Sequence, residues 1–249
     1  MKAILTYHSI DPSDSPVSVD ETTFRRHVRW LESGSVRVVP IPELMRLPPE
    51  TDAVALTFDD GFRNFATVAA PLLLDSGLPA AVFVVSERAG KTNAWSGVSD
   101  GKVPTLPLLD WGELSDLAER GVELGAHTRT HPRLGELSAA AQRDEIAGSV
   151  ERIAAETGHR PRGFAYPYGS VSDETTAAVA ESCEWACTTE LRPLNAAECS
   201  HRLPRLDMFY WRAPGRLEAW GTPRFRRYLW LRAGARRVRR SLAAVTERI

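Results

Sequence analysis

Short apolar segments alternate with helix-forming segments along most of this 249-residue chain. Runs of small and β-branched residues predict strands, and amphipathic runs opened by Asp110 and Ser138 predict helices. Such alternation is typical of parallel strands joined by right-handed helical crossovers, so we predict an α/β fold whose sheet is closed or nearly closed. The predicted strands are 2–7, 36–39, 53–58, 80–85, 122–126, 164–166, 185–189 and 202–206.

The length of the chain suits one large α/β barrel domain. A hydrophobic fraction of 43% and a charged fraction of 25% are ordinary for a soluble globular protein. No apolar run approaches the roughly 18 residues that span a bilayer, and Met1 and Lys2 lead into a short strand rather than a signal peptide. We therefore expect a cytoplasmic protein. The cysteines lack metal-site spacing, so we expect reduced thiols.

Four residues that suit a catalytic metal site follow two of the predicted strands. Asp59 and Asp60 come directly after one strand, and His127 comes directly after another, with His131 four residues later. The carboxyl ends of parallel strands meet at one edge of a sheet, and a helical turn would place both imidazoles on the same side. One carboxylate and two imidazoles leave coordination positions open for water and substrate, as in catalytic zinc sites. The second carboxylate is then available as a base.

The C-terminal segment, residues 222–249, differs from the rest. It contains nine Arg and one acid, Glu247, so its net charge is +8 and that of the remaining residues is −9. Its apolar residues predict one stripe on a helix, which either docks on the barrel, the interpretation we favour, or contacts anionic lipids. Nucleic acid is a poorer candidate partner because the rest of the chain is acidic and no base-reading motif is present. The stripe comprises Tyr228, Leu231, Ala235, Val238, Leu242, Val245 and Ile249.

Three ordered motifs resemble those of the polysaccharide deacetylases, the NodB-homology domains of carbohydrate esterase family four. They are Thr57-Phe-Asp-Asp-Gly61, His127-Thr-Arg-Thr-His131 and Phe164-Ala-Tyr-Pro-Tyr-Gly169, and the resemblance covers about residues 2–206. It implies a distorted (β/α) barrel of about seven parallel strands, here residues 1–221, followed by the basic amphipathic helix of residues 222–249. It also implies removal of N- or O-acetyl groups from sugars with a divalent metal.

The resemblance also implies the roles of individual residues. Asp59 would be the catalytic base, and Asp60, His127 and His131 would hold the metal. Zn²⁺ is the expected ion, with Co²⁺, Ni²⁺ or Mn²⁺ as alternatives. The backbone N–H of Tyr168 would help bind the oxyanion.

The sequence departs from the family pattern in the third motif. Many members have an Arg before the proline, where it pairs with the base, but Tyr166 occupies that place here. Arg162 and Arg205 are the candidate replacements, and we include Arg205 among the catalytic residues.

The general acid is also displaced, because the usual late Leu-His motif is not evident. His201 is one candidate. We favour His8, at the end of the first predicted strand, since biofilm-polysaccharide deacetylases show a similar early Tyr-His.

Aromatic and amide side chains near the predicted site are candidates for sugar contacts. Asn93 and Trp95 lie in a long loop, residues 87–109, and loops of that length are often functional. Tyr166 and Trp111 are further candidates for the wall of the site, although each can equally serve in packing.

The sequence therefore favours a metal-dependent hydrolase that removes the acetyl group of an N-acetylated sugar, as a polysaccharide, oligosaccharide or lipid-linked sugar. Lipid-linked sugar becomes the natural substrate if the basic segment binds the inner face of the membrane. Two alternatives remain: a cyclic-amide hydrolase of the same superfamily, acting on purine-like compounds, and an inactive carbohydrate-binding barrel.

Overall fold

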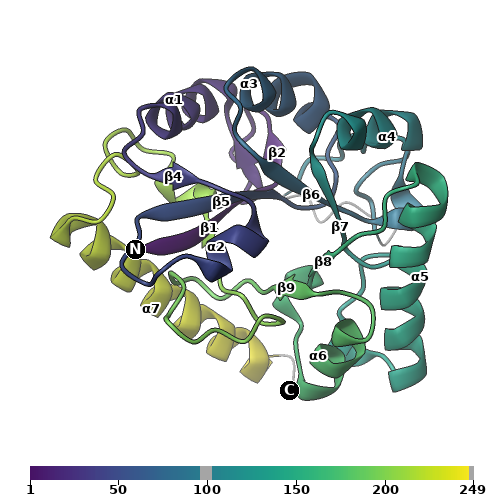
Figure 1. Ribbon diagram of the computed structural model, residues 1–249. Helices are drawn as coiled ribbons and strands as arrows, with labels where there is room; N and C mark the ends of the chain where they lie inside the picture. The colour runs from purple at the N-terminus through teal and green to yellow at the C-terminus, as the bar shows by residue number, and fades with distance from the viewer. Residues whose placement is uncertain (96–102, 247–249) are drawn as a thin grey trace.

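The computed structural model describes the backbone of residues 1–95 and 103–246, and the side chains of this part up to residue 238. Its centre is a curled sheet of parallel strands in the order β10-β1-β5-β6-β7-β8-β9, with β4 paired beside β5 (Figure 1). This confirms the predicted distorted (β/α) barrel. The strands are β1 Lys2–Tyr7, β4 Arg37–Val38, β5 Ala53–Phe58, β6 Ala80–Val84, β7 Glu123–Ala126, β8 Gly163–Ala165, β9 Trp185–Cys187 and β10 Leu206–Asp207, with a separate pair β2 Ser9–Ile10 and β3 Ser18–Val19.

The two ends of the sheet approach each other but join only weakly. A parallel bridge links Cys187 at the end of β9 to Leu203, just before β10. The predicted strand 202–206 is therefore shifted, because β10 begins only at Leu206. Pro204 has no N–H to donate to a ladder, which explains the break.

Helices cover the outside of the sheet, as Figure 1 shows. Asp110 accepts a hydrogen bond from the backbone N–H of Glu113, and Ser138 caps the helix that follows it, as predicted. The structure adds two helices that we did not predict, α1 and α2. The helices are α1 Glu21–Glu32, α2 Ile41–Arg46, a π-helical turn Phe65–Ala69 that leads into α3 Ala70–Asp75, α4 Trp111–Glu119, α5 Ala139–Thr157, α6 Asp173–Ala180 and α7 Pro223–Thr246, with single 3₁₀ turns at Ser86–Arg88, Leu134–Glu136, Pro167–Gly169 and Met208–Trp211.

The inside of the barrel is filled by large rings over small residues. Phe83 and Trp185 are fully buried there, together with Ile4 and Ala55. The Trp185 ring lies where a side chain of Gly163 would be, since a Cβ at that glycine would lie 2.1 Å from it. This tight packing of side chains fills the interior of the barrel.

The C-terminal helix α7 packs on the barrel, but only in part through the predicted stripe. Phe225 and Leu229, four residues apart, are buried in the core of the barrel domain, whereas Leu231 and Val238 are 54% and 61% exposed. The prediction holds for Tyr228, which packs against Trp211, but the docked face is rotated from the stripe towards Phe225 and Leu229. The side chains of Leu242 and Val245, and all of Ile249, lie outside the described residues. Within the described chain, no helix combines the length and apolar character needed to cross a bilayer.

Candidate active site

Asp59 and Asp60 lie at the carboxyl end of β5. The ladder between β1 and β5 continues into them, because the N–H of Asp59 donates to the carbonyl of Tyr7 at 3.0 Å. Asp60 then takes a left-handed conformation, φ 72°, as does Gly61. Such a turn is uncommon for a non-glycine residue and often marks a functional position. It directs the chain away from the strand while both carboxylates stay buried.

His127 and His131 come together through an irregular loop rather than the helical turn that we predicted. His127 follows β7, and Thr128 and His131 have left-handed φ angles of 67° and 69°. The Thr128 hydroxyl accepts the N–H of His131 at 3.0 Å. The side chain of Glu145 in α5 accepts hydrogen bonds from the backbone N–H groups of Arg129 and Thr130. These bonds fix the loop to α5.

Asp60, His127 and His131 form a buried group that can hold a metal ion. The Nε2 atoms of both imidazoles lie 3.3 Å from the same oxygen, Oδ1 of Asp60. The three ligand atoms all lie within 4.8 Å of one another. Burial alone would raise the pKa of Asp60, but hydrogen bonds to the two imidazoles hold it well below its usual range. The site thus offers one ionised carboxylate and two imidazole nitrogens.

The other ring nitrogens of the two histidines are engaged outside the group. Nδ1 of His127 lies 2.7 Å from the carbonyl of Ala165, and Nδ1 of His131 lies 3.1 Å from the hydroxyl of Tyr168. A hydrogen bond from Nδ1 leaves the Nε2 lone pair free for a metal, and such outer partners are usual at metal sites. The donor set and its support therefore fit a divalent cation such as zinc.

Asp59 is held by Arg205. Two guanidinium nitrogens donate to its two carboxylate oxygens at 2.6 and 2.7 Å, and Arg205 is only 2% exposed. Burial alone would raise the pKa of Asp59, but the adjacent charge of Arg205 lowers it below its ordinary value. Arg205 also donates to the Thr6 hydroxyl and to the Thr188 carbonyl. Asp59 is therefore an ionised carboxylate of fixed orientation.

The structure places His8, and not His201, beside Asp59. Nε2 of His8 lies 3.7 Å from Oδ2 of Asp59. The ring of His201 instead bonds to the Cys183 carbonyl and the Ser200 hydroxyl, at 3.0 and 3.1 Å. Of the two candidates for the general acid, only His8 has the geometry to serve.

Aromatic side chains border the metal group. Trp95 stacks on His131 with ring centroids 4.4 Å apart, and the Tyr168 ring meets the same imidazole edge-on. Tyr168 is half exposed, its backbone is left-handed at φ 58°, and Arg133 lies over its ring. Trp95 and Tyr168 thus form an aromatic border beside the metal group.

Two predicted substrate contacts, Asn93 and Tyr166, need correction. The Asn93 amide bonds to the backbone of Pro104 and Leu106, so it stabilises the long loop. Tyr166 is fully buried, and its hydroxyl donates to the His201 carbonyl.

Trp111, a further candidate for the wall of the site, is partly buried in packing. Its ring packs between α4 and α5, against the guanidinium of Arg152. Arg162, the other candidate partner of Asp59, pairs with Glu184 on the surface.

Sequence reasoning missed the residues that support the site. Thr6 and Thr57 share a buried hydroxyl hydrogen bond of 2.8 Å below Arg205. Thr6 lies two residues before His8, and Thr57 lies two residues before Asp59, in the adjacent strands β1 and β5. Because side chains two residues apart along a strand point to the same side, both threonines face the inside of the barrel. This period-two spacing was a usable signal.

Comparison with known proteins identifies the family to which this barrel belongs. The family model described as polysaccharide deacetylase matches residues 46–185. The chain belongs to this family. YxkH of Bacillus subtilis is 26% identical over 193 residues, covering 75% of this chain and 64% of YxkH, so the chain spans under two thirds of that relative. The poly-β-1,6-N-acetyl-D-glucosamine N-deacetylase of Staphylococcus epidermidis is 21% identical, covering 76% of this chain and 67% of the enzyme.

Solved structures share the fold. IcaB from Ammonifex degensii superposes with a TM-score of 0.70 at 20% identity, covering 92% of this chain and 96% of that one. The Streptococcus pyogenes deacetylase PplD, solved in complex with acetate, gives 0.68 at 22% identity, covering 82% and 91%. At this identity the likeness concerns the fold alone.

Proposed function

We propose that this protein is a metal-dependent deacetylase that hydrolyses the acetyl amide of an N-acetylated sugar. The observation that supports this most directly is the juxtaposition of two parts. One is the buried Asp60–His127–His131 group, and the other is Asp59 with Arg205 on one side and His8 on another. A metal group, a base and an acid in one site are what amide hydrolysis requires.

Asp60, His127 and His131 hold the cation in this proposal. A divalent metal there supplies Lewis acidity and favours the ionisation of water near neutral pH. Asp59, kept ionised by Arg205, takes the proton from the attacking water. His8 in its protonated form gives a proton to the leaving nitrogen, because an amine leaves poorly as an anion. The backbone N–H of Tyr168 is the proposed donor to the oxyanion.

The proposed substrate class is an acetylated hexosamine in a polysaccharide, an oligosaccharide or a lipid-linked sugar. Support comes from the Staphylococcus epidermidis relative, whose name specifies poly-β-1,6-N-acetyl-D-glucosamine. Trp95, half-buried against His131, offers an aromatic face to a sugar ring. Zn²⁺ is the proposed ion.

A cytoplasmic location, with contact to the inner membrane face through the basic segment, is also a proposal. On α7, Trp230, Leu231 and Val238 are exposed among arginines, a composition that suits a membrane interface. Fractionation of cells that produce the full chain tests it. We expect a membrane-associated share that falls in Trp230→Ser. A wholly soluble protein with an unaltered variant contradicts membrane contact.

The proposed activity is tested by acetate release from N-acetylglucosamine oligomers and lipid-linked acetylated sugars. The proteins are metal-loaded wild type, Asp59→Asn and the control Asp173→Asn, whose carboxylate pairs with Arg202 on the surface. We expect metal-dependent release that falls about 10²–10⁴-fold in Asp59→Asn and is unchanged in the control.

Absence of release from every sugar, with metal bound, would contradict the proposal. Turnover of cyclic amides under the same conditions would favour the purine-like alternative. Sugar binding without turnover of either substrate class would favour the inactive barrel.

A further inference from the structure

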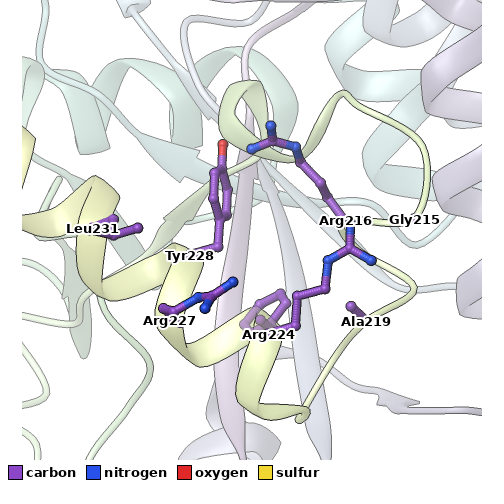
Figure 2. A pocket seen from close by; sticks show the side chains of 8 residues that line it. Gly215, Arg216, Ala219, Arg224, Arg227, Tyr228 and Leu231 are labelled. Carbon is purple, nitrogen blue, oxygen red and sulfur yellow. The ribbon is translucent and has the colours of Figure 1, made fainter.

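A hollow of about 180 Å³ lies between the start of α7 and the loop that precedes it (Figure 2). That volume is more than ten times the roughly 15 Å³ that one water needs. Arg216 reaches into it from the loop, and Arg224 and Arg227 line it from the helix. Tyr228 and Leu231 form part of the remaining wall. The hollow thus combines three guanidinium groups with aromatic and aliphatic surface.

The three arginines of the hollow lack carboxylate partners. Among the described residues, no Asp or Glu oxygen lies within 4.0 Å of the guanidinium groups of Arg216, Arg224 or Arg227. The Arg216 guanidinium lies 4.0 Å from the centre of the Tyr228 ring, and its Nη1 is buried without a hydrogen-bond partner.

Other arginines along α7 are engaged within the chain. Arg236 lies 3.6 Å from a carboxylate oxygen of Asp207, and Arg232 donates to the hydroxyl of Tyr228 at 2.9 Å. Arg226 and Arg237 are exposed on the same helix but do not line the hollow. The hollow therefore differs from the rest of the described helix in bringing three guanidinium groups to one cavity.

The position of the hollow adds to the positive potential. The first turn of α7 contains no acidic residue, and the amino end of a helix carries a partial positive charge. Arg224 and Arg227 lie where carboxylates, not cations, are favourable. An anion in the hollow would reduce the mutual repulsion of the arginines. It would also interact favourably with the partial positive charge at the amino end of α7.

The chemistry of the lining favours a phosphate group. Guanidinium groups match phosphate oxygens in bidentate fashion, and one tetrahedral phosphate can accept donors from several directions at once. The apolar wall at Leu231 suits the organic part of a phosphate ester. Trp230, next in sequence to Leu231, is 73% exposed.

None of the residues that line the hollow belongs to the metal group, and none is Asp59, Arg205 or His8. Trp220, close to the hollow in the chain, donates to Asp52, which precedes β5. Asp59 follows the same strand. An anion bound in the hollow is therefore not a reactant at the metal group.

We propose that the hollow formed by Arg216, Arg224 and Arg227 is a binding site for a phosphate group, supplied by a phosphate ester in solution or by the headgroup of an anionic phospholipid. This inference goes beyond the deacetylase activity and does not depend on it.

The test measures binding of inorganic phosphate by calorimetry, and binding to phosphatidylglycerol and phosphatidylcholine vesicles by co-sedimentation. The full chain is compared with Arg216→Gln, Arg227→Gln and the matched control Arg237→Gln. Arg237 is exposed on the same helix but does not line the hollow. Circular dichroism checks the fold, and Arg227→Gln suffices if Arg216→Gln misfolds because Arg227 is exposed.

We expect each hollow variant to weaken binding about tenfold or more, as loss of a charged hydrogen-bonded contact implies, and Arg237→Gln to change it less than twofold. Binding of inorganic phosphate with no preference for phosphatidylglycerol assigns the site to soluble phosphates. Binding to phosphatidylglycerol vesicles that the hollow variants lose assigns it to lipid headgroups. Equal losses in all three variants, or no binding to either probe, would overturn the proposal.

Discussion

Arg205 donates to both carboxylate oxygens of Asp59, at 2.6 and 2.7 Å, although 146 residues separate the two in the chain. Arg205 immediately precedes β10, and β10 pairs with β1, which in turn pairs with β5. The barrel therefore brings the arginine that precedes its last strand to the carboxylate that follows an early strand. The pair fixes both the charge and the orientation of the proposed base.

Arg205→Ala should destabilise the fold strongly, because it leaves the buried carboxylate of Asp59 without its partner. The expected loss is about 3–5 kcal/mol in the free energy of unfolding. The matched control is Arg162→Ala, which breaks an exposed pair with Glu184 and should cost far less, because water screens that pair. Urea denaturation measures both. Similar losses in the two variants would mean that the buried pair contributes no more than a surface contact.

His8→Gln should reduce amide hydrolysis more than ester hydrolysis. Loss of a general acid costs about 10²–10⁴-fold when the leaving group is an amine, whereas a phenolate leaves without a proton. Turnover of an acetylated sugar and of an aryl acetate is compared in wild type, His8→Gln and His201→Gln. We expect His201→Gln to retain both activities. A similar loss on both substrates in His8→Gln would assign His8 a role other than the acid.

Tyr168→Phe should weaken metal binding without removing a ligand. Its hydroxyl lies 3.1 Å from Nδ1 of His131, and loss of such an outer partner typically costs 10–100-fold in metal affinity or activity. Competition with a chelator measures the affinity for Zn²⁺. Tyr210→Phe, a substitution near α7, serves as the control and should bind Zn²⁺ as wild type does. An unchanged affinity in Tyr168→Phe would show that the hydroxyl does not support His131 in the metal-bound protein.

His27 should make stability depend on pH through a neutral buried imidazole. The Tyr7 hydroxyl lies 3.1 Å from Nδ1, and Nε2 lies 3.1 Å from the Trp211 carbonyl. Burial lowers the pKa of His27 to about 4. The unfolded chain, with a pKa near 6.5, binds the proton first as pH falls. The contribution of His27 is therefore present above about pH 6.5 and lost as pH falls to about 4, where both states are protonated.

The expected loss attributable to His27 is about 3 kcal/mol between pH 7 and pH 4. Urea denaturation across this range compares wild type with His27→Gln and with His159→Gln, which alters an exposed histidine. The pH dependence should flatten in His27→Gln and persist in His159→Gln. Identical slopes in all three proteins would mean that His27 is not the group that titrates.

Local patterns were sufficient for the sheet and the metal group. Each of Asp59, Asp60 and His127 follows directly after a strongly apolar strand, and parallel strands bring their carboxyl ends together. The helices capped by Asp110 and Ser138 began where predicted because capping is a local interaction. The signal for α1 was also present, since Asp20 caps it and Phe24 lies on its buried face, but it was not used.

Other assignments depended on contacts that no local pattern specifies. Asn93 and Tyr166 are residue types that suit sugar binding. In the fold, however, the Asn93 amide bonds to the loop backbone, and the Tyr166 ring is buried in the core. The face that α7 presents to the barrel includes Phe225 and Leu229 and excludes Trp230, so the rotation of the helix depends on the surface against which it docks and not on its own apolar pattern alone.

The sequence by itself determined the alternation of most strands with helices, the family and the three residues of the metal group, because each of these rests on short motifs at the ends of strands. Only the tertiary structure decided that Arg205 pairs with Asp59, that His8 rather than His201 adjoins it, and that three arginines share one hollow. These relationships join residues far apart in the chain. Their energies depend on burial and distance, which exist only once the barrel has closed.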